Sequence, residues 1–161
     1  MIFMKIDGIE GEATNKGHEK WCEVISMSNA VHRKIADGAV DTSRVRGSTT
    51  LGDVHVSKKL DKASVKLQEK CAAGEFIPKV EIHVCTKVGN AETTILKYVL
   101  SNVIVSQYDI NCTDPAQSSP VETVSLDYEK VEWTYTVLDH NKGTKQGEVA
   151  GKYNAGKGTT A

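Results

Sequence analysis

The stretch DKASVKLQEKCAAGEFIPKVEIHV, residues 61–84, contains the one clear helical pattern of this chain and the start of a strand. Asp61 can accept hydrogen bonds from the exposed amides of a first helical turn. Gly74 suits the left-handed conformation that ends many helices, and Pro78 excludes helical continuation. We therefore predict a short helix over residues 62–73, followed by a strand from Pro78.

The residues of this predicted helix divide into an apolar and a charged set. Apolar side chains recur at three- and four-residue spacings, which place them on one helix face, formed by Leu60, Ala63, Leu67 and Cys71. The lysines in and before the helix are interpreted as a solvated face rather than as phosphate contacts, and they are Lys58, Lys59, Lys62, Lys66 and Lys70.

Most of the remaining chain has the two-residue alternation of β-strands with one buried face. It begins with Val80, Ile82 and Val84, and a turn is expected at residues 89–90. The same alternation continues through Thr94, Leu96, Tyr98 and Leu100, and again through Val124, Leu126, Tyr128, Val131, Trp133, Tyr135 and Val137. The sequence predicts a mainly β fold, either an antiparallel β-barrel or two packed sheets, with one short α-helix on the outside.

Two segments depart from this regular pattern. Residues 38–52 are rich in glycine, serine and threonine, and a loop of this length in a compact domain is usually functional or disordered. Residues 138–161 contain glycine–lysine pairs and little apolar content. We expect one barrel domain over residues 1–137 and a flexible or partner-ordered tail over residues 138–161.

Composition limits the possible functions. The 161 residues carry a formal net charge of −1, so no global basic field attracts nucleic acid. Four widely spaced cysteines lack zinc-site spacing, which favours buried free thiols at Cys22, Cys71 and Cys85 and a loop thiol at Cys112. The N-terminus lacks the pattern of a Sec signal, and no run reaches membrane-spanning length, so neither Sec export nor direct membrane insertion is expected.

The sequence shows no pattern of catalytic or cofactor-binding residues. The five histidines lie on different expected elements, without the spacing of a helical metal site. Phosphate-loop, nucleophile-elbow and dinucleotide-binding motifs are missing. His18 followed by Glu19 is interpreted as a turn or strand-start pair. We predict no catalytic, cofactor-binding or metal-binding residues and a protein that is not an enzyme.

The order of these elements resembles the haemolysin-coregulated proteins (Hcp), which form the tube of bacterial type VI secretion machines. The resemblance lies in the opening run of residues 2–13, in Gly17-His18-Glu19 and in the strand-like residues 21–25. It continues in VSKKLDKAS, residues 56–64, in GEFIP, residues 74–78, and in the last long strand pattern. Met27 and Asn29 depart from the family, because many members have aromatic residues there.

The resemblance implies a structural role. Hcp proteins typically form hexameric rings that stack into a hollow tube and shelter small effector proteins in the lumen. It implies partners in the spike protein, sheath and baseplate of the machine, and a protein that is cytoplasmic before firing and secreted afterwards without a signal peptide. The matching loop of Hcp-like proteins reaches a neighbouring subunit, so the candidate interface residues are Arg44, Val45, Arg46, Thr49 and Leu51. A mobile surface loop is the alternative.

Alternation in residues 26–29 places Ser26 and Ser28 opposite Met27, on a polar face that could line a channel. They are the candidate lumen-lining residues. Two other functions remain open. A bacteriophage-type tail tube protein shares the architecture, and a secreted β-barrel enzyme or ligand-binding module requires a pocket that one sequence does not reveal.

Overall fold

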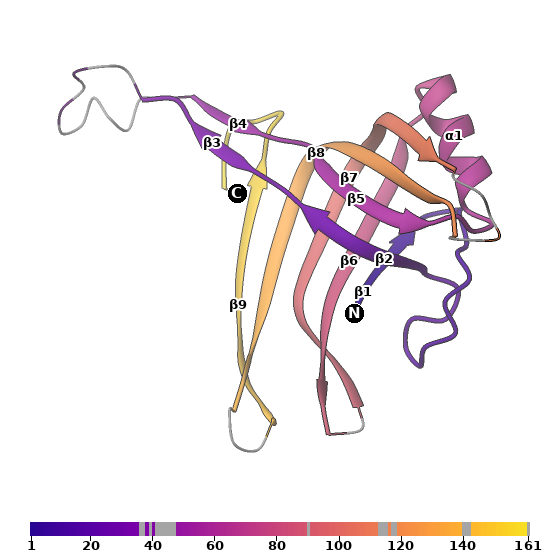
Figure 1. Cartoon of the computed structure of the whole chain (residues 1–161). Coiled ribbons are helices and arrows are strands. Elements are labelled where there is room, and N and C mark those ends of the chain that lie inside the picture. Colours follow the sequence, from indigo (N-terminus) through magenta and orange to yellow (C-terminus); the bar gives the residue numbers. More distant parts are fainter. Residues whose placement is uncertain are drawn as a thin grey trace.

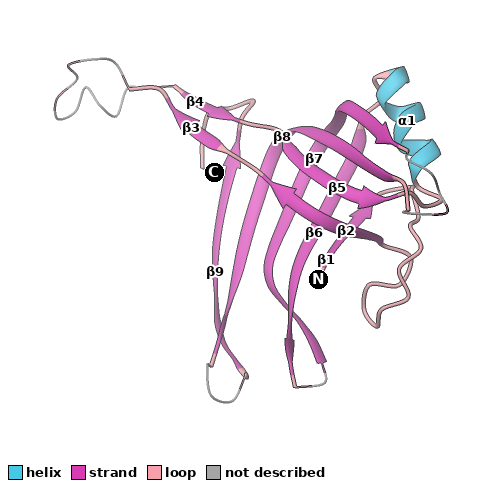
Figure 2. Ribbon diagram, in the orientation of Figure 1, coloured by secondary structure: helices cyan, strands magenta, loops and turns pink. Residues whose placement is uncertain are grey.

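A computed structural model describes residues 1–35, 38, 40, 48–89, 91–112, 116, 119–139 and 143–160. Figures 1 and 2 show long strands curving around a closed barrel, with a helix at its periphery. The strands are β1 (Ile2–Ile6), β2 (Cys22–Ser28), β3 (Val31–Arg33), β4 (Thr49–Leu51), β5 (Val54–Lys59), β6 (Ile77–Val88), β7 (Ala91–Asn111), β8 (Val121–Leu138) and β9 (Lys145–Asn154), and the helix is α1 (Ser64–Ala73).

The sheet closes on itself, which decides between the barrel and the two packed sheets left open by the sequence. Its strand order is β5-β2-β1-β6-β7-β8-β9, and β5 also pairs with β8. This last pairing, from Val54 opposite Leu126 to Lys59 opposite Val121, completes a six-stranded antiparallel barrel with β9 outside the closed circuit. Closure gives the edges of β5 and β8 hydrogen-bond partners that an open sheet would lack.

The barrel interior is the main hydrophobic core, as the alternating pattern predicted. Inward side chains of all six barrel strands are buried there, together with Ala63 and Leu67. The strand residues of this core include Met4, Ile6, Cys22, Val54, Val56, Val80, Ile82, Leu100, Val103, Val105, Val124, Leu126, Tyr128 and Val131. Fully burying one such aliphatic side chain stabilises the fold by about 1.5–3 kcal/mol, so the interior supplies most of the driving force for folding.

Strict alternation fails at two places in the long β7–β8 pair, of which one is a register shift between Val105 and Gln107 and the other lies near Asn102. Leu100 and Val103 are both buried, so two residues rather than one separate consecutive inward positions of β7. Asn102, with φ of 53°, lies at this change of phase and donates a hydrogen bond to Glu129 Oε2 at 2.6 Å. Asparagine tolerates this left-handed conformation better than most residues, which lets the strand continue after the change.

The helix follows the local sequence signals closely. Asp61 Oδ1 accepts from the amide of Ala63 at 2.9 Å, and Gly74 ends the helix with φ of 64°. Ala63 and Leu67 are buried and Cys71 packs against the core, but Leu60 is exposed, so its assignment to the buried face was wrong. Leu60 precedes the helix by four residues and therefore does not share its face.

Two expectations about the irregular segments require correction. The segment after Val137, expected to be a flexible or partner-ordered tail, contains β9, which pairs with β8 from Lys130 opposite Asn154 to Leu138 opposite Lys145. Residues 38–52, expected to be a long loop, contribute β4, which pairs with β3. Both strands are poor in apolar residues, and pairing to a neighbouring strand, rather than burial, stabilises them.

Candidate functional site

The two-stranded β3–β4 unit projects from the barrel as an arm, which comprises residues 31–51 as far as they are described (Figure 1). Val31 is opposite Leu51 and Arg33 is opposite Thr49. At the base, the Asn29 side-chain amide donates to the Gly52 carbonyl at 2.9 Å and to the Tyr128 hydroxyl at 3.1 Å. The second of these bonds ties the base of the arm to β8.

The arm contains the predicted interface residues only in part. Thr49 and Leu51 lie in β4, where Leu51 packs partly against the main core and Thr49 is half-buried. Arg44, Val45 and Arg46 lie outside the described residues.

Apolar side chains on the described arm are strongly exposed at Val31, Ile35 and Val40. The arm thus carries apolar surface away from the barrel, where its own chain leaves it exposed to solvent.

The two candidate lumen residues lie on β2 as the alternation predicted. Ser26 is opposite Ser57 and Ser28 is opposite His55, and both serines are exposed. Met27, between them, packs against the main core. Ile25, at the register shift between Val24 and Ser26, is also 53% exposed, so the polar outer face of β2 is confined to the end of the strand nearest the arm.

An apolar row crosses five neighbouring strands at one end of the barrel. It consists of Ile2, Val84, Leu96, Tyr135 and Val149, each paired in register with the next. The first three are half-buried, but Tyr135 is 51% exposed and Val149 is 65% exposed. The row therefore emerges from the core face and becomes a solvent-facing apolar surface where β8 and β9 extend beyond the barrel.

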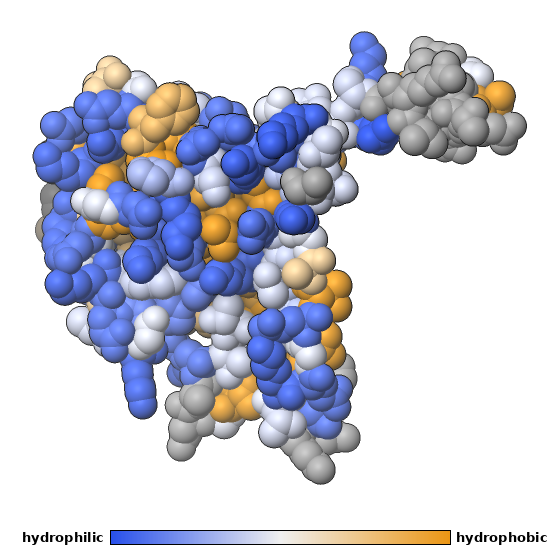
Figure 3. All heavy atoms as spheres, turned by 180° about the vertical axis from the view of Figure 1, so that it is seen from behind, coloured by the Kyte–Doolittle hydropathy of each residue, from blue (hydrophilic) through white to orange (hydrophobic). Residues whose placement is uncertain are grey.

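The adjacent register row enlarges this surface. It pairs Tyr98 with Trp133 and Trp133 with Gly151, and both aromatic rings pack partly against the core. Seen from behind, hydrophobic atoms reach the surface along the side of the molecule where β8 and β9 lie (Figure 3). β9 ends the sheet order, so its second edge has no strand partner within the described part of the chain. A clustered apolar surface beside an open strand edge is typical of a protein interface.

A buried ion-pair cluster joins the barrel to the segment before α1. Lys58 of β5 is fully buried, with its Nζ 2.8 Å from Asp61 Oδ1 and 2.6 Å from Glu122 Oε1 of β8. The same ammonium donates to the Lys59 carbonyl at 2.9 Å. Tyr108 of β7 donates to the second Glu122 oxygen. One positive and two negative groups thus share a site in which Lys58 and Glu122 are fully buried and Asp61 is 10% exposed.

The local environment shifts the ionisation of three groups in the cluster. Burial opposes the charge of Lys58, but its hydrogen bonds to Asp61 and Glu122 outweigh this and raise its pKa. Burial, strengthened by the neighbouring Asp61 carboxylate, raises the pKa of Cys22 to about 12. Burial and the hydrogen bond to Glu122 raise the pKa of Tyr108 to about 12. The thiol and phenol therefore stay neutral while the lysine stays charged.

Sequence reasoning missed this cluster and assigned Lys58 wrongly to a solvated lysine face. The signal was present in the alternation, because Lys58 is in phase with Val54 and Val56, and Glu122 is in phase with Val124. Both charges therefore had to point inward. Only the register of β5 against β8, which places Lys58 opposite Glu122, shows that they neutralise each other.

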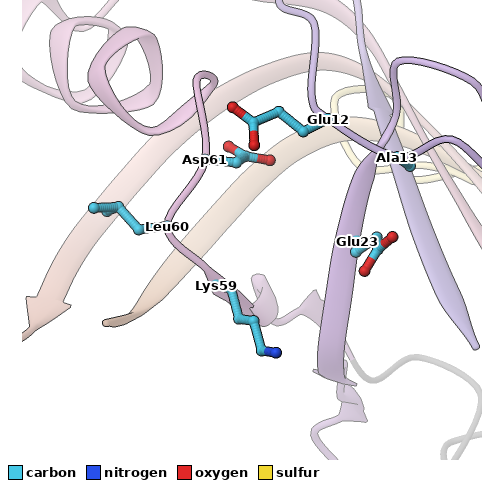
Figure 4. Close-up of a pocket in the computed structure, with 6 residues that line it drawn as sticks. All are labelled: Glu12, Ala13, Glu23, Lys59, Leu60 and Asp61. Atoms are coloured by element: carbon cyan, nitrogen blue, oxygen red, sulfur yellow. The ribbon is translucent and has the colours of Figure 1, made fainter. Parts of the chain in front are cut away.

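A shallow pocket of about 230 Å³ lies beside this cluster (Figure 4). Its side chains come from the segment after β1, from β2 and from the end of β5, and they are Glu12, Ala13, Glu23, Lys59, Leu60 and Asp61. Asp61 is already held by Lys58, and Glu12 Oε1 accepts from the Lys62 amide at 3.1 Å. Among the described residues that line the pocket, none is a histidine, cysteine, serine or threonine that could act as a nucleophile or as an imidazole base.

Metal-binding groups do not cluster in the described part of the chain, where no set of three or more His, Cys, Asp or Glu side chains could hold an ion. The cysteines are free thiols: Cys22 and Cys85 are buried, Cys71 is half-buried and Cys112 is exposed. Among the described residues, no helix is long and apolar enough to span a membrane.

Comparison with known proteins places the chain in a family. The model of the family described as "Type VI secretion system effector, Hcp" matches residues 3–135. The solved "Structure of a type six secretion system protein" has a TM-score of 0.90 at 26% identity, covering 98% of this chain and 97% of the other. The crystal structure of Hcp1 from Salmonella typhimurium has a TM-score of 0.77 at 26% identity, with coverage of 99% and 98%.

A type VI secretion system effector from Yersinia pestis shares the fold, with a TM-score of 0.76 at 23% identity and coverage of 96% and 99%. The search of curated proteins found no match to this chain. The barrel, its external helix and these similarities define a tube-type protein of type VI secretion. The chain belongs to the Hcp family, which is a structural, secreted family rather than a known enzyme family.

Proposed function

We propose that this protein forms hexameric rings that stack into the inner tube of a type VI secretion machine and carry small effector proteins in the lumen. The observation that supports this most strongly is the apolar row, which leaves the core and becomes exposed at Tyr135 and Val149. A folded chain that presents such a surface gains free energy when a partner covers it. A neighbouring copy is the partner that family membership indicates.

The exposed apolar arm and the apolar row are two unlike surfaces on one subunit. Because a head-to-tail contact joins unlike surfaces, repetition of one contact by rotation closes a ring. We propose that the arm of each subunit, including Thr49, Leu51 and the segment with Arg44, Val45 and Arg46, contacts the next subunit. The exposed Val31 and Ile35 of the arm would then be buried in the ring.

Light scattering of the purified native protein across a dilution series, with negative-stain imaging of the same samples, tests the ring. We expect annular particles with the mass of about six chains, which dissociate on dilution because association depends on protein concentration. A strict monomer at high concentration, with no rings on the grid, contradicts the proposal and leaves the family assignment intact.

The polar outer face of β2 is proposed to face the lumen through Ser26 and Ser28, which are exposed on the same side of the strand. We expect Ser28→Gln to weaken retention of cargo without unfolding the subunit, because an exposed position tolerates a larger polar side chain. Co-purification of effector with the variant ring measures retention, and circular dichroism verifies the fold. Cargo retention equal to that of the unmodified ring argues against this placement.

The proposed cellular route follows from family membership. Rings would assemble in the cytoplasm, meet the sheath, baseplate and spike protein of the machine, and be expelled with it. Stacking in this proposal uses the two ring faces, which differ because a head-to-tail ring is polar.

A further inference from the structure

A small lobe, residues 10–21, lies against the barrel as a separate packing unit. Its backbone is closed by hydrogen bonds from Gly11 to the Lys20 carbonyl at 2.7 Å and from Ala13 to the Trp21 carbonyl at 2.9 Å. A second hydrophobic cluster fills the space beneath it, with Phe3 of β1, Cys85 of β6 and Ala13 buried and Trp21 packed against them.

A histidine pair connects the lobe to the barrel. His18 of the lobe is buried, and its Nε2 lies 2.9 Å from Nδ1 of His83 on β6. The His18 ring stacks on Phe3 with centroids 4.4 Å apart, and the His83 ring lies 4.6 Å from that of Trp21. These ring contacts and the hydrogen bond all depend on His18 and His83 remaining in place.

The hydrogen bond between the rings restricts how many protons the pair can hold. One ring must accept through a bare nitrogen while the other donates, so a doubly protonated pair would place two N–H groups against each other. The remaining nitrogens, His18 Nδ1 and His83 Nε2, are buried, and neither has a hydrogen-bond partner in the described structure. A proton added to either nitrogen therefore gains no hydrogen bond in this arrangement.

Several charges face the pair from the elements packed around it. Glu19 of the lobe and Glu92 of β7 favour a charged His18, and Glu81, whose Oε2 is 3.8 Å from His83 Nε2, favours a charged His83. Lys97 of β7 disfavours a charged His83, and Glu81 already forms ion pairs with Lys79 and Lys97. On the Cys85 side, the Met1 ammonium donates to the Cys85 carbonyl, and the Cys85 sulfur lies 3.9 Å from His18 Nε2.

Burial outweighs these carboxylates. It lowers the pKa of His18, where Glu92 and Glu19 act in the opposite sense. Burial, the neighbouring His18 and Lys97 lower the pKa of His83 to about 4. Since a released histidine titrates at about 6.5, the open lobe binds more protons than the closed lobe at acid pH. The closed form is therefore fully favoured above about pH 6.5 and loses stability as the pH falls toward about 4.

We propose that His18 and His83 form an acid-sensitive clasp, which holds residues 10–21 on the barrel at neutral pH and releases them on acidification while the barrel stays closed. The main core lies on the other side of the sheet, and its described residues include no histidine, so we expect release of the lobe to leave it intact. This property belongs to the single subunit and is independent of ring assembly.

Acrylamide quenching of Trp21 fluorescence tests the clasp in the full-length protein. Trp133→Phe removes the other tryptophan, so the signal reports the lobe alone. We expect the quenching constant to rise at least about twofold between about pH 7 and pH 4, since Trp21 leaves its ring contacts. Far-UV circular dichroism, recorded on the same samples, is expected to stay constant.

His18→Phe in the same background is expected to remove this rise, because phenylalanine keeps the stack on Phe3 and binds no proton. His32→Phe, at an exposed histidine on β3, is the matched control and is expected to retain it. A flat response in the parent, an equal rise in His18→Phe, or loss of β structure together with the rise would overturn the proposal.

NMR of the unmodified protein keeps the test decisive if His18→Phe does not fold. The ring protons of His18 and His83 and the amides of residues 10–21 are followed in one pH titration. We expect the lobe amides to shift at the pH where the pair titrates. Lobe amides that stay unchanged while both histidines become protonated would also overturn the clasp.

Discussion

Lys58→Met is expected to destabilise the subunit by about 3–5 kcal/mol, because it leaves two buried carboxylates without their cation. Glu122 is fully buried and Asp61 nearly so, and Lys58 Nζ lies within 2.8 Å of both. Methionine fills much of the lysine volume, so little of the loss comes from a cavity. For a chain of this size the melting temperature should fall by roughly 6–20 °C.

Two comparison variants isolate the charge effect. Lys62→Met removes a lysine whose pair with Glu10 is exposed, so its free energy of unfolding should change by less than about 0.5 kcal/mol. The double variant Lys58→Met/Glu122→Gln should lose less free energy of unfolding than the two single variants lose together, because the two side chains form one ion pair. Urea unfolding curves of the unmodified protein, the three single variants and the double variant measure these changes. A loss below about 1 kcal/mol for Lys58→Met would show that the cluster is not closed to water.

Val149→Asp is expected to weaken association by roughly 30-fold or more, which corresponds to about 2 kcal/mol or more, because it places an unpaired charge in the proposed interface. Val149 is 65% exposed in the single chain, at the exposed end of the apolar row. The subunit itself should retain its fold, since the side chain contributes little to the core. Light scattering of the variant should therefore give single chains at concentrations where the unmodified protein forms rings.

Val65→Asp supplies the matched control. Val65 is 70% exposed on α1, which lies on the opposite side of the barrel from β9 (Figure 1), so the same chemical change occurs at a similar exposure. We expect its rings to persist. If both variants dissociate, or if neither does, the apolar row is not the lateral interface and another surface holds the ring.

Much of the barrel could be predicted because its signals are local. Alternation of Val80 and Ile82 follows from the pleat of a strand, and Asp61 and Gly74 act on atoms a few residues away. β9 was not predicted, since GEVAGK has few apolar residues and becomes a strand only through pairing with β8. Whether such a segment becomes a strand depends on the strand it pairs with and not on its own residues.

In the candidate site, too, the features that depend on neighbouring residues could be predicted, and those that depend on distant residues could not. Exposure of Ser26 and Ser28 opposite Met27 followed from alternation, and their place in a lumen stays a prediction. Lys58 was assigned wrongly because charge alone suggested a solvated position. The pair of His18 and His83 was not foreseen, since 65 residues separate them.

By itself the sequence determined the class of fold, the helix and its ends, and the family, because each depends on residue order and on contacts within a few positions. Tertiary structure alone decided that Lys58 neutralises Glu122, that the apolar row emerges at Val149 and that His18 meets His83. These features depend on the register between distant strands. Closure of the whole barrel sets this register. Shifting one strand by one residue would turn each of its inward side chains outward.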